Sequence, residues 1–265
     1  MIDHGRSLGA DSLVRGLMCI HTTFTCPPDF ITRAYGLALD RDVALHAHVN
    51  EGTHEGVLCE ERYGMRTLAL YDSLGVAGSR LLASQCVQVD EHEQQIIAER
   101  RVRVSHMPLS NCEVGGGIAP IPELLAEGVT IGLGSDGYLN DMFQVMRGAC
   151  LIHKARLCDP RVMPASTVFA LATIGGARAL GLDGRIGRLA PGYAADLQLI
   201  DASFPTPASD HNLYDQLVLW RTGADVTDVM VDGRWRVRHR TIEGFDPERS
   251  RALVGEQALR LWNRR

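Results

Sequence analysis

The chain has 265 residues, of which 45% are hydrophobic and 22% are charged, and its formal net charge is −5 at pH 7. This composition is that of a globular protein and excludes a disordered chain. No run approaches the roughly 18 apolar residues that a membrane helix needs. The acidic balance, with arginines dispersed along the chain, excludes a nucleic-acid-binding surface. We therefore expect a small-molecule substrate as the partner, neither nucleic acid nor membrane, with a homo-oligomer as an option.

The seven cysteines are scattered along the chain and form no Cys-x-x-Cys pair. This pattern predicts neither a disulfide framework nor a thiolate zinc site. The first residues, MIDHGRSLGADS, lack the charged-then-apolar order of a secretion signal. We therefore expect a cytoplasmic protein.

Short apolar runs alternate with amphipathic stretches over the first 183 residues, which is typical of parallel β/α units. Strands are predicted at 14–21, 43–49, 80–87, 102–107 and 129–136. Helices are predicted at about 28–40, 55–75, 90–100, 120–127, 139–157 and 164–181. The expected fold class is therefore α/β, with five β/α units in a row.

The character of the sequence changes after residue 183. Residues 184–240 alternate glycine and proline turns with short β runs, including the Asp-Gly turn in VTDVMVDGRWRV, and predict a small β-sandwich-type module. Residues 241–265 contain an Asp-Pro start and apolar residues at helical spacing, which predict a terminal helix. Three parts are thus expected, with the β/α units confined to residues 1–183.

Polar residues stand at or just after the end of each predicted strand: His21, His48 with Glu51, Gln85 with Gln88, His106 and Asp136. In a β/α barrel the carboxyl ends of the strands carry the chemistry, because the loops there form one shared mouth. The alternative is that these are ordinary polar loop residues. The stretch LHAHVNEG (45–52) shows the same ambiguity, since a histidine on an apolar run is either a ligand or a packed core residue.

Several segments together resemble the amidohydrolase superfamily, in its deaminase and chlorohydrolase branch, and within it the SsnA-like aminohydrolases. The resemblance is carried by IHTTFT (20–25), LHAHVNEG (45–52), HMPLSNCEVGGGIAPIPELLAEGVTIGLGSDG (106–137), DGYLNDMF (136–143) and GRIGRLAPGYAADLQLID (184–201). It implies the last five units of a TIM-type (β/α)8 barrel. It also implies a metal-dependent hydrolase or deaminase that uses metal-activated water to break a C–N bond of a small cyclic amidine or nucleobase-like substrate.

The resemblance implies a role for each matching residue. His48 matches a metal ligand, and Glu51 matches the acid that passes a proton to the substrate nitrogen. Asp136 matches a ligand that also takes a proton from the bound water. His21 and His106 match positions that face the substrate. One divalent ion is implied, zinc first and iron or manganese as alternatives, because such an ion lowers the pKa of bound water to about 7.

The sequence departs from the family in two ways. Five predicted strands are three fewer than a complete barrel has, and the strand that carries the family's His-x-His pair is among the three. By the order of the segments, His48 is then the ligand and His46 a packing or supporting residue. Gln85 and Gln88 stand where relatives have histidines, the first of which belongs to the metal site. An amide is a poor zinc ligand, so Gln85 marks a departed ligand position.

Two classes of function stay open at this point. One is the metal-dependent hydrolase or deaminase. The other is a catalytically inactive truncated remnant or an interaction subunit of an amidohydrolase, favoured by the strand count and by the two glutamines. On the second hypothesis, three origins of the chain are open: a fragment, the product of a mis-started reading frame, or a shortened protein. A rearranged site of His46, His48 and His106 for another metal is a further option, but it discards the order of the segments.

Overall fold

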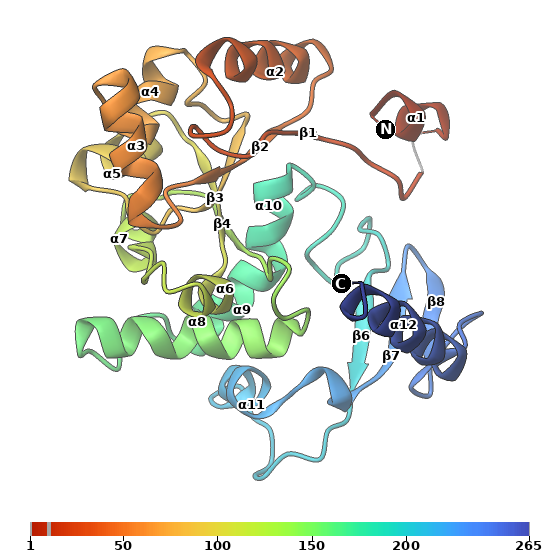
Figure 1. Cartoon of the computed structure of the whole chain (residues 1–265). Helices are drawn as coiled ribbons and strands as arrows, with labels where there is room; N and C mark the ends of the chain where they lie inside the picture. Colours follow the sequence, from red (N-terminus) through yellow and green to blue (C-terminus); the bar gives the residue numbers. More distant parts are fainter. Residues whose placement is uncertain (1, 10–11, 265) are drawn as a thin grey trace. The chain divides into compact units, whose positions relative to one another are not determined.

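The computed structural model of the chain describes residues 2–9 and 12–264. It forms two compact units, Met1–Tyr193 with Phe204–Gly223, and Ala194–Ser203 with Ala224–Arg265 (Figure 1). This division differs from the predicted boundary after residue 183. It also groups the terminal helix with the neighbouring strands, where the sequence predicted a separate part.

The first unit contains a five-stranded parallel sheet in the order β1-β2-β3-β4-β5. Its strands are β1 (Met18–Cys19), β2 (Leu45–Val49), β3 (Leu81–Gln85), β4 (Arg103–His106) and β5 (Ile131–Leu133). Each strand lies inside one predicted segment, and each pairs with its neighbour in sequence, as short helical crossovers dictate. The predicted α/β class with five consecutive β/α units is confirmed.

Helices precede, connect and follow the strands of this sheet (Figure 1). They are α1 (Ile2–Ser7), α2 (Pro28–Asp40), α3 (Thr53–Tyr63), α4 (Thr67–Ser73), α5 (Glu91–Glu99), α6 (Pro108–Glu113), α7 (Ile121–Ala126), α8 (Met142–Leu157), α9 (Ala165–Ala170), a π-helical turn (Leu171–Gly175), α10 (Gly176–Leu180) and α11 (Leu213–Trp220). The predicted helix 55–75 is two helices, because Gly64 adopts a φ of 72° and ends α3. The short helices α1, α6 and α11 were not predicted. Within residues 2–9 and 12–264 no helix is long and apolar enough to cross a membrane.

One face of the parallel sheet carries the histidines of β2. The three apolar residues of β2 are fully buried, whereas His46 and His48, which alternate with them, are half-buried. Partners in a parallel ladder point to the same face of the sheet. The register pairs His48 with Ser84, and Ser84 with Ser105. We call this side of the sheet the histidine face.

The second unit contains a four-stranded antiparallel sheet in the order β6-β7-β8-β9. Its elements are β6 (Leu197–Ile200), a 3-10 turn that begins in the first unit (Gly223–Asp225), β7 (Val226–Val231), β8 (Arg234–Arg238), β9 (Thr241–Ile242) and α12 (Pro247–Trp262). Asp232 and Gly233 both have positive φ, as the predicted Asp-Gly hairpin turn requires. Asp246 caps α12, which is the predicted terminal helix. In the described chain these strands form one sheet, so a sandwich is not seen there.

Close packing between β5 and α10 gives a test of the fold. A Cβ at Gly132 would lie 2.8 Å from the Cα of Gly176. We expect Gly132→Ala to lower the free energy of unfolding by about 1–3 kcal/mol, the usual cost of overpacking, as measured by urea denaturation. Gly36→Ala is the control, because nothing lies within 4 Å of its Cβ. An equal loss in both variants contradicts this packing.

Candidate functional site

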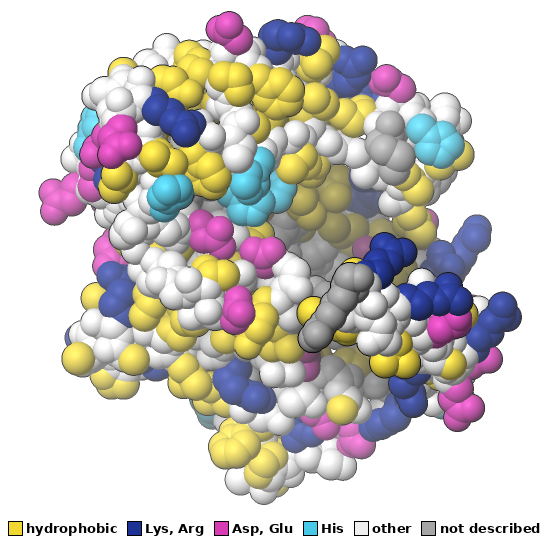
Figure 2. Space-filling view, viewed as in Figure 1, with side chains coloured by type: hydrophobic (Ala, Val, Ile, Leu, Met, Phe, Trp, Pro, Cys, Tyr) yellow, Lys and Arg dark blue, Asp and Glu magenta, His cyan; other side chains and the backbone are white. Residues whose placement is uncertain are grey.

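A cavity of about 400 Å³ opens at the carboxyl end of β2, a volume typical of small-molecule sites. Three of the predicted site residues line it: His21, His48 and Glu51. The other lining residues are Thr22, Phe24, Gly52, Thr53, His54, Glu55, Gln88, Val114, Gly115 and Gly116. Figure 2 shows histidine side chains gathered beside acidic ones on the face in view.

His21 and His48 meet across neighbouring strands at the rim of this cavity. Their ring centroids lie 5.2 Å apart with the planes at 71°, and the backbone N–H of His48 donates to the His21 carbonyl over 3.0 Å. Thr25 Oγ1 lies 2.8 Å from His21 Nδ1. Within the described chain, the buried His48 Nδ1 has no hydrogen-bond partner. Such an orphaned nitrogen is what a bound ion, water or ligand would satisfy.

His46 supports the strand pair and does not line the cavity. Its Nε2 lies 2.7 Å from Ser84 Oγ, which itself donates to the carbonyl of Ala47 over 3.1 Å. Burial, and secondarily the charge of His48, lower the pKa of His46. These contacts are those of a packed, neutral imidazole.

Asp136 follows β5, lies outside the cavity lining and is held by three donors. Gln85 Nε2 and Ser110 Oγ donate to its Oδ2 over 2.9 and 3.0 Å, and the N–H of Gly137 donates to its Oδ1 over 2.6 Å. Burial alone would raise the pKa of Asp136, but these hydrogen bonds and the charge of His48 together lower it. Asp136 is therefore an ionised acceptor whose two oxygens are already engaged.

Gln85 reaches Asp136 from an unusual backbone conformation at the end of β3. The register places Gln85 beside Val49, on the side of the sheet away from His48. Its φ is +75° and that of Cys86 is +50°. A left-handed conformation costs a residue with a Cβ roughly 1–2 kcal/mol, and such strain clusters at functional sites. We infer that this backbone aims the fully buried amide at Asp136.

The described side chains do not fit a complete metal site. Within residues 2–9 and 12–264, no three His, Cys, Asp or Glu side chains lie together so that they could hold an ion. His48 and Asp136 offer an imidazole and a carboxylate, which are donor types that zinc accepts, but a catalytic zinc usually has three protein ligands. Gln85, which stands where the sequence comparison with the family predicts a histidine ligand, donates a hydrogen bond to Asp136.

Glu51 lies half-exposed in the loop after β2, with its backbone fixed by a glycine loop. A Cβ at Gly116 would lie 2.4 Å from the Glu51 carbonyl oxygen, so only glycine permits this approach. Gln88 Nε2 donates to the Gly116 carbonyl over 2.6 Å. Gln88, the second of the two glutamines that stand where relatives have histidines, therefore anchors the glycine loop that packs on Glu51.

A buried carboxylate that the sequence reading missed supports the same loop. Glu93 has no exposed surface and accepts hydrogen bonds from Asn50 Nδ2 at 2.8 Å, from the N–H of Leu68 at 3.0 Å and from Arg66 Nε at 2.8 Å. With Asp90 it also forms the capping box of α5. The Asp-x-x-Glu spacing of that box was the signal in the sequence that could have found Glu93.

A second buried carboxylate, that of Glu55 on α3, holds the same loop. Glu55 accepts the backbone N–H of Asn50 and the hydroxyl of Thr23, the latter over 3.2 Å. Burial raises the pKa of Glu55. Asn50 directly precedes Glu51. The carboxylates of Glu55 and Glu93 both bind Asn50 and therefore fix the start of the loop that carries Glu51.

His106, which the sequence predicted to face the substrate, does not line the cavity at Glu51. The register pairs His106 with Leu133, and Ser105, one residue earlier, shares the histidine face with His48. The alternation along β4 therefore turns His106 to the other side. There it is fully buried, with its Nε2 3.1 Å from Nε2 of His153 on α8.

The family model described as the amidohydrolase family matches residues 5–236. A 5-methylthioadenosine/S-adenosylhomocysteine deaminase of Pelotomaculum thermopropionicum is 36% identical over 260 residues, covering 97% of this chain and 60% of the relative. A 5'-deoxyadenosine deaminase of Methanothermobacter thermautotrophicus is 37% identical over 256 residues, covering 95% and 60%. The chain belongs to the amidohydrolase family, as its sequence motifs predicted, and it spans about 60% of the length of these curated relatives.

Solved structures agree with the sequence relatives. An adenosine deaminase of Xanthomonas campestris with bound zinc superposes with a TM-score of 0.91 at 31% identity, covering 97% of this chain and 60% of that one. The guanine deaminase of E. coli gives a TM-score of 0.75 at 25% identity, covering 85% and 55%. These likenesses support the α/β class, and the first shows that a similar protein binds zinc.

The buried histidine pair predicts that acid weakens the fold. Burial, and secondarily the charge of Arg156, lower the pKa of His153 from 6.5 to about 4, and burial also holds the pKa of His106 well below its usual range. In the unfolded chain His153 is protonated below about pH 6.5. In the folded protein it is protonated only below about pH 4. Stability therefore falls as the pH drops through this window, by on the order of 3 kcal/mol for His153 alone.

His153→Met should flatten the pH dependence of the unfolding free energy between pH 6.5 and 4, as measured by urea denaturation. The control is His92→Met, because His92 is exposed on α5. A slope that is unchanged in His153→Met shows that the pair does not carry this dependence.

Gln85→His replaces the amide beside Asp136 with a third donor of a type that zinc accepts. We expect the zinc affinity to rise at least about 10-fold, as measured by competition with a chromophoric chelator. Gln88→His is the matched control, since Gln88 contacts the backbone of Gly116 and not Asp136. If Gln85→His binds zinc no better than the wild type, the end of β3 does not belong to the metal site.

Proposed function

We propose that this chain carries part of the active site of a hydrolytic deaminase, which removes the exocyclic amino group of an adenosine derivative. The amino group of adenine belongs to a cyclic amidine, so the proposal narrows the substrate class expected from the sequence. The observation that carries it is the cavity that joins Glu51 to His48 and His21 at the carboxyl end of the sheet. The names of the relatives support an adenosine derivative, and they do not favour an inactive remnant or interaction subunit.

The five parallel strands are, on this proposal, part of a β/α barrel whose mouth holds the site. The polar residues at the ends of β1, β2 and β5 support this reading, because barrel enzymes place their chemistry there. A partial barrel also agrees with the share of the relatives' length that the chain spans.

Glu51 is the proposed acid and base. Its carboxylate accepts a proton from the attacking water and delivers it to the amino nitrogen, so that a C–O bond forms, the C–N bond breaks and ammonia leaves. Proton transfer of this kind contributes about 100- to 10,000-fold to a rate. The fixed backbone of Glu51, packed against Gly116, supports this role because proton transfer needs the carboxylate within hydrogen-bond reach of the substrate.

His21 is the proposed substrate-binding residue at the rim. Its ring is exposed and lies 5.6 Å from the ring of Phe24, edge to face at 77°. The ring of Phe24 in turn lies 5.6 Å from that of His54. These aromatic walls suit a flat heterocycle such as a purine.

A divalent ion is part of the proposal, with zinc supported by the Xanthomonas structure and iron or manganese as alternatives. His48 and Asp136 are its proposed ligands. Because these two donors do not fit a tight site, we expect the ion to bind weakly and to exchange. The seven free cysteines support a reducing, cytoplasmic setting.

The test is ammonia release from 5'-deoxyadenosine, adenosine and 5-methylthioadenosine with zinc in excess. We expect release by the wild-type chain and a rate about 100- to 10,000-fold lower for Glu51→Gln. Glu61→Gln, an exposed carboxylate on α3, is the matched control and should keep the rate. No release from any of these nucleosides, or equal rates in the two variants, contradicts the proposal.

A further inference from the structure

A second cavity of about 650 Å³ lies at the opposite end of the same sheet, within the first unit. It shares no residue with the cavity at Glu51. Its walls come from α1, from Gly9 and residues 12–17, from the amino ends of β2, β3 and β4, and from the end of α10. What binds there is therefore independent of the proposed deaminase chemistry.

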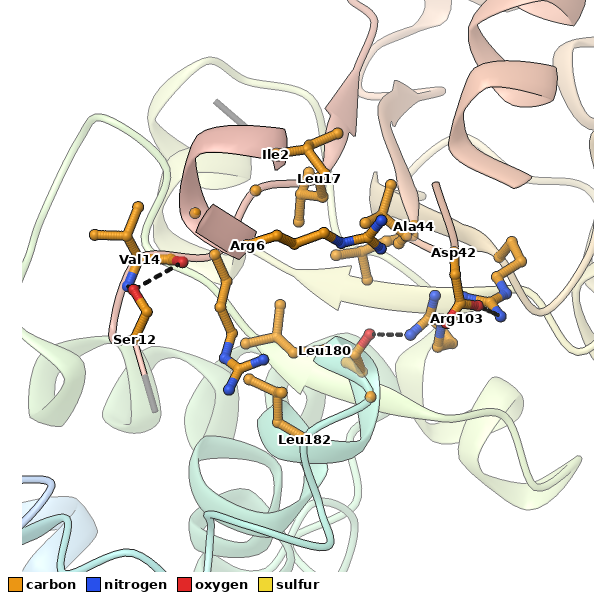
Figure 3. Close-up of a pocket in the computed structure, with 18 of the residues that line it drawn as sticks. Ile2, Arg6, Ser12, Val14, Leu17, Asp42, Ala44, Arg103, Leu180 and Leu182 are labelled. Carbon is orange, nitrogen blue, oxygen red and sulfur yellow. Dashed lines mark hydrogen bonds and ion pairs between the residues drawn. The ribbon is translucent and has the colours of Figure 1, made fainter. Parts of the chain in front are cut away.

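The charge of this cavity is opposite to that of the protein. Four arginines line it against one acidic residue, a positive excess in a chain whose net charge is −5: Arg6, Arg15, Arg80, Arg103 and Asp42. Figure 3 shows Arg6 and Arg103 reaching into this space from different segments of the chain. Charges of one sign inside a cavity raise the local concentration of the opposite ion.

The guanidinium group of Arg103 is only partly satisfied by hydrogen bonds. Its Nη1 donates to the carbonyl of Ala179 over 2.8 Å. Its Nε is buried and has no hydrogen-bond partner in the part of the chain that the structure describes. The neighbouring Arg80 forms an ion pair with Asp42, and its positive charge adds to burial in lowering the pKa of Arg103. An anion between the two guanidinium groups would relieve both the burial and the repulsion.

Four leucines supply an apolar part of the cavity wall. They are Leu17, Leu82, Leu180 and Leu182, of which Leu17, Leu180 and Leu182 can be followed in Figure 3. A cavity of this volume is large enough for a small organic molecule. The ligand that fits has a compact anionic group at one end and an apolar body at the other.

We propose that this cavity binds a small organic phosphate, with the phosphate group at Arg80 and Arg103 and the organic part against the leucines. A phosphate suits the site better than a carboxylate does, because it carries up to two charges and offers oxygens to more than one planar guanidinium fork. The site lies at the amino ends of the strands, so its ligand is not the substrate of the Glu51 cavity.

The test is isothermal titration calorimetry of the full chain at fixed ionic strength, with inorganic phosphate, phenyl phosphate and benzoate as probes. Phenyl phosphate is expected to bind at least 10-fold more tightly than either inorganic phosphate or benzoate. Absence of phosphate binding, or equal affinity for benzoate, overturns the proposal. The first result would mean that the cavity is filled by polypeptide or by water.

Arg103→Met and Arg80→Met should each weaken the binding of phenyl phosphate at least 10-fold. The more exposed Arg80 keeps the test valid if Arg103→Met, which also loses its hydrogen bond to Ala179, fails to fold. Arg251→Met, at an exposed arginine of α12, is the matched control and should bind as the wild type does. Equal binding by the Arg80 and Arg251 variants overturns the proposal, because it assigns the affinity to general surface charge.

Discussion

The candidate site depends on one buried carboxylate, that of Glu93. Its two oxygens hold the side chain of Asn50, the backbone of Leu68 and the guanidinium of Arg66, which joins the loop after β2 to helices α4 and α5. A buried carboxylate is stable only when it is paired and its lone pairs are satisfied. Both conditions are met here, so the residue before Glu51 has a single position relative to the sheet.

The apolar runs predicted the parallel sheet well, because buried parallel strands are the most continuous hydrophobic segments in a sequence. The polar residues after those runs located one end of the sheet, and His21, His48 and Glu51 do meet there. His106 could not be placed in this way. A shift of one residue moves a side chain to the other face of a strand, and the length of an apolar run does not define which residue points where.

Other features depend on tertiary contacts that no pattern reveals. The hydrogen bond from Gln85 to Asp136 joins the ends of β3 and β5, with β4 between them, and it starts from a left-handed backbone. Glu55 sits on a helix whose sequence is that of an ordinary amphipathic segment, so the burial of its carboxylate was not expected. Residue types predicted where candidate site residues lie along the chain. The direction in which each side chain points could be found only from the strand register and the backbone angles.

The chain belongs to the amidohydrolase family, and Gln85 places an amide against Asp136, one of the two proposed metal ligands. The most direct measurement of this combination is the zinc content per chain, by elemental analysis of the purified protein after loosely held ions have been removed. Two donors predict a content well below one zinc per chain. One tightly held zinc per chain would contradict the two-donor site and would require a third ligand among residues that do not lie beside His48 and Asp136 in this structure.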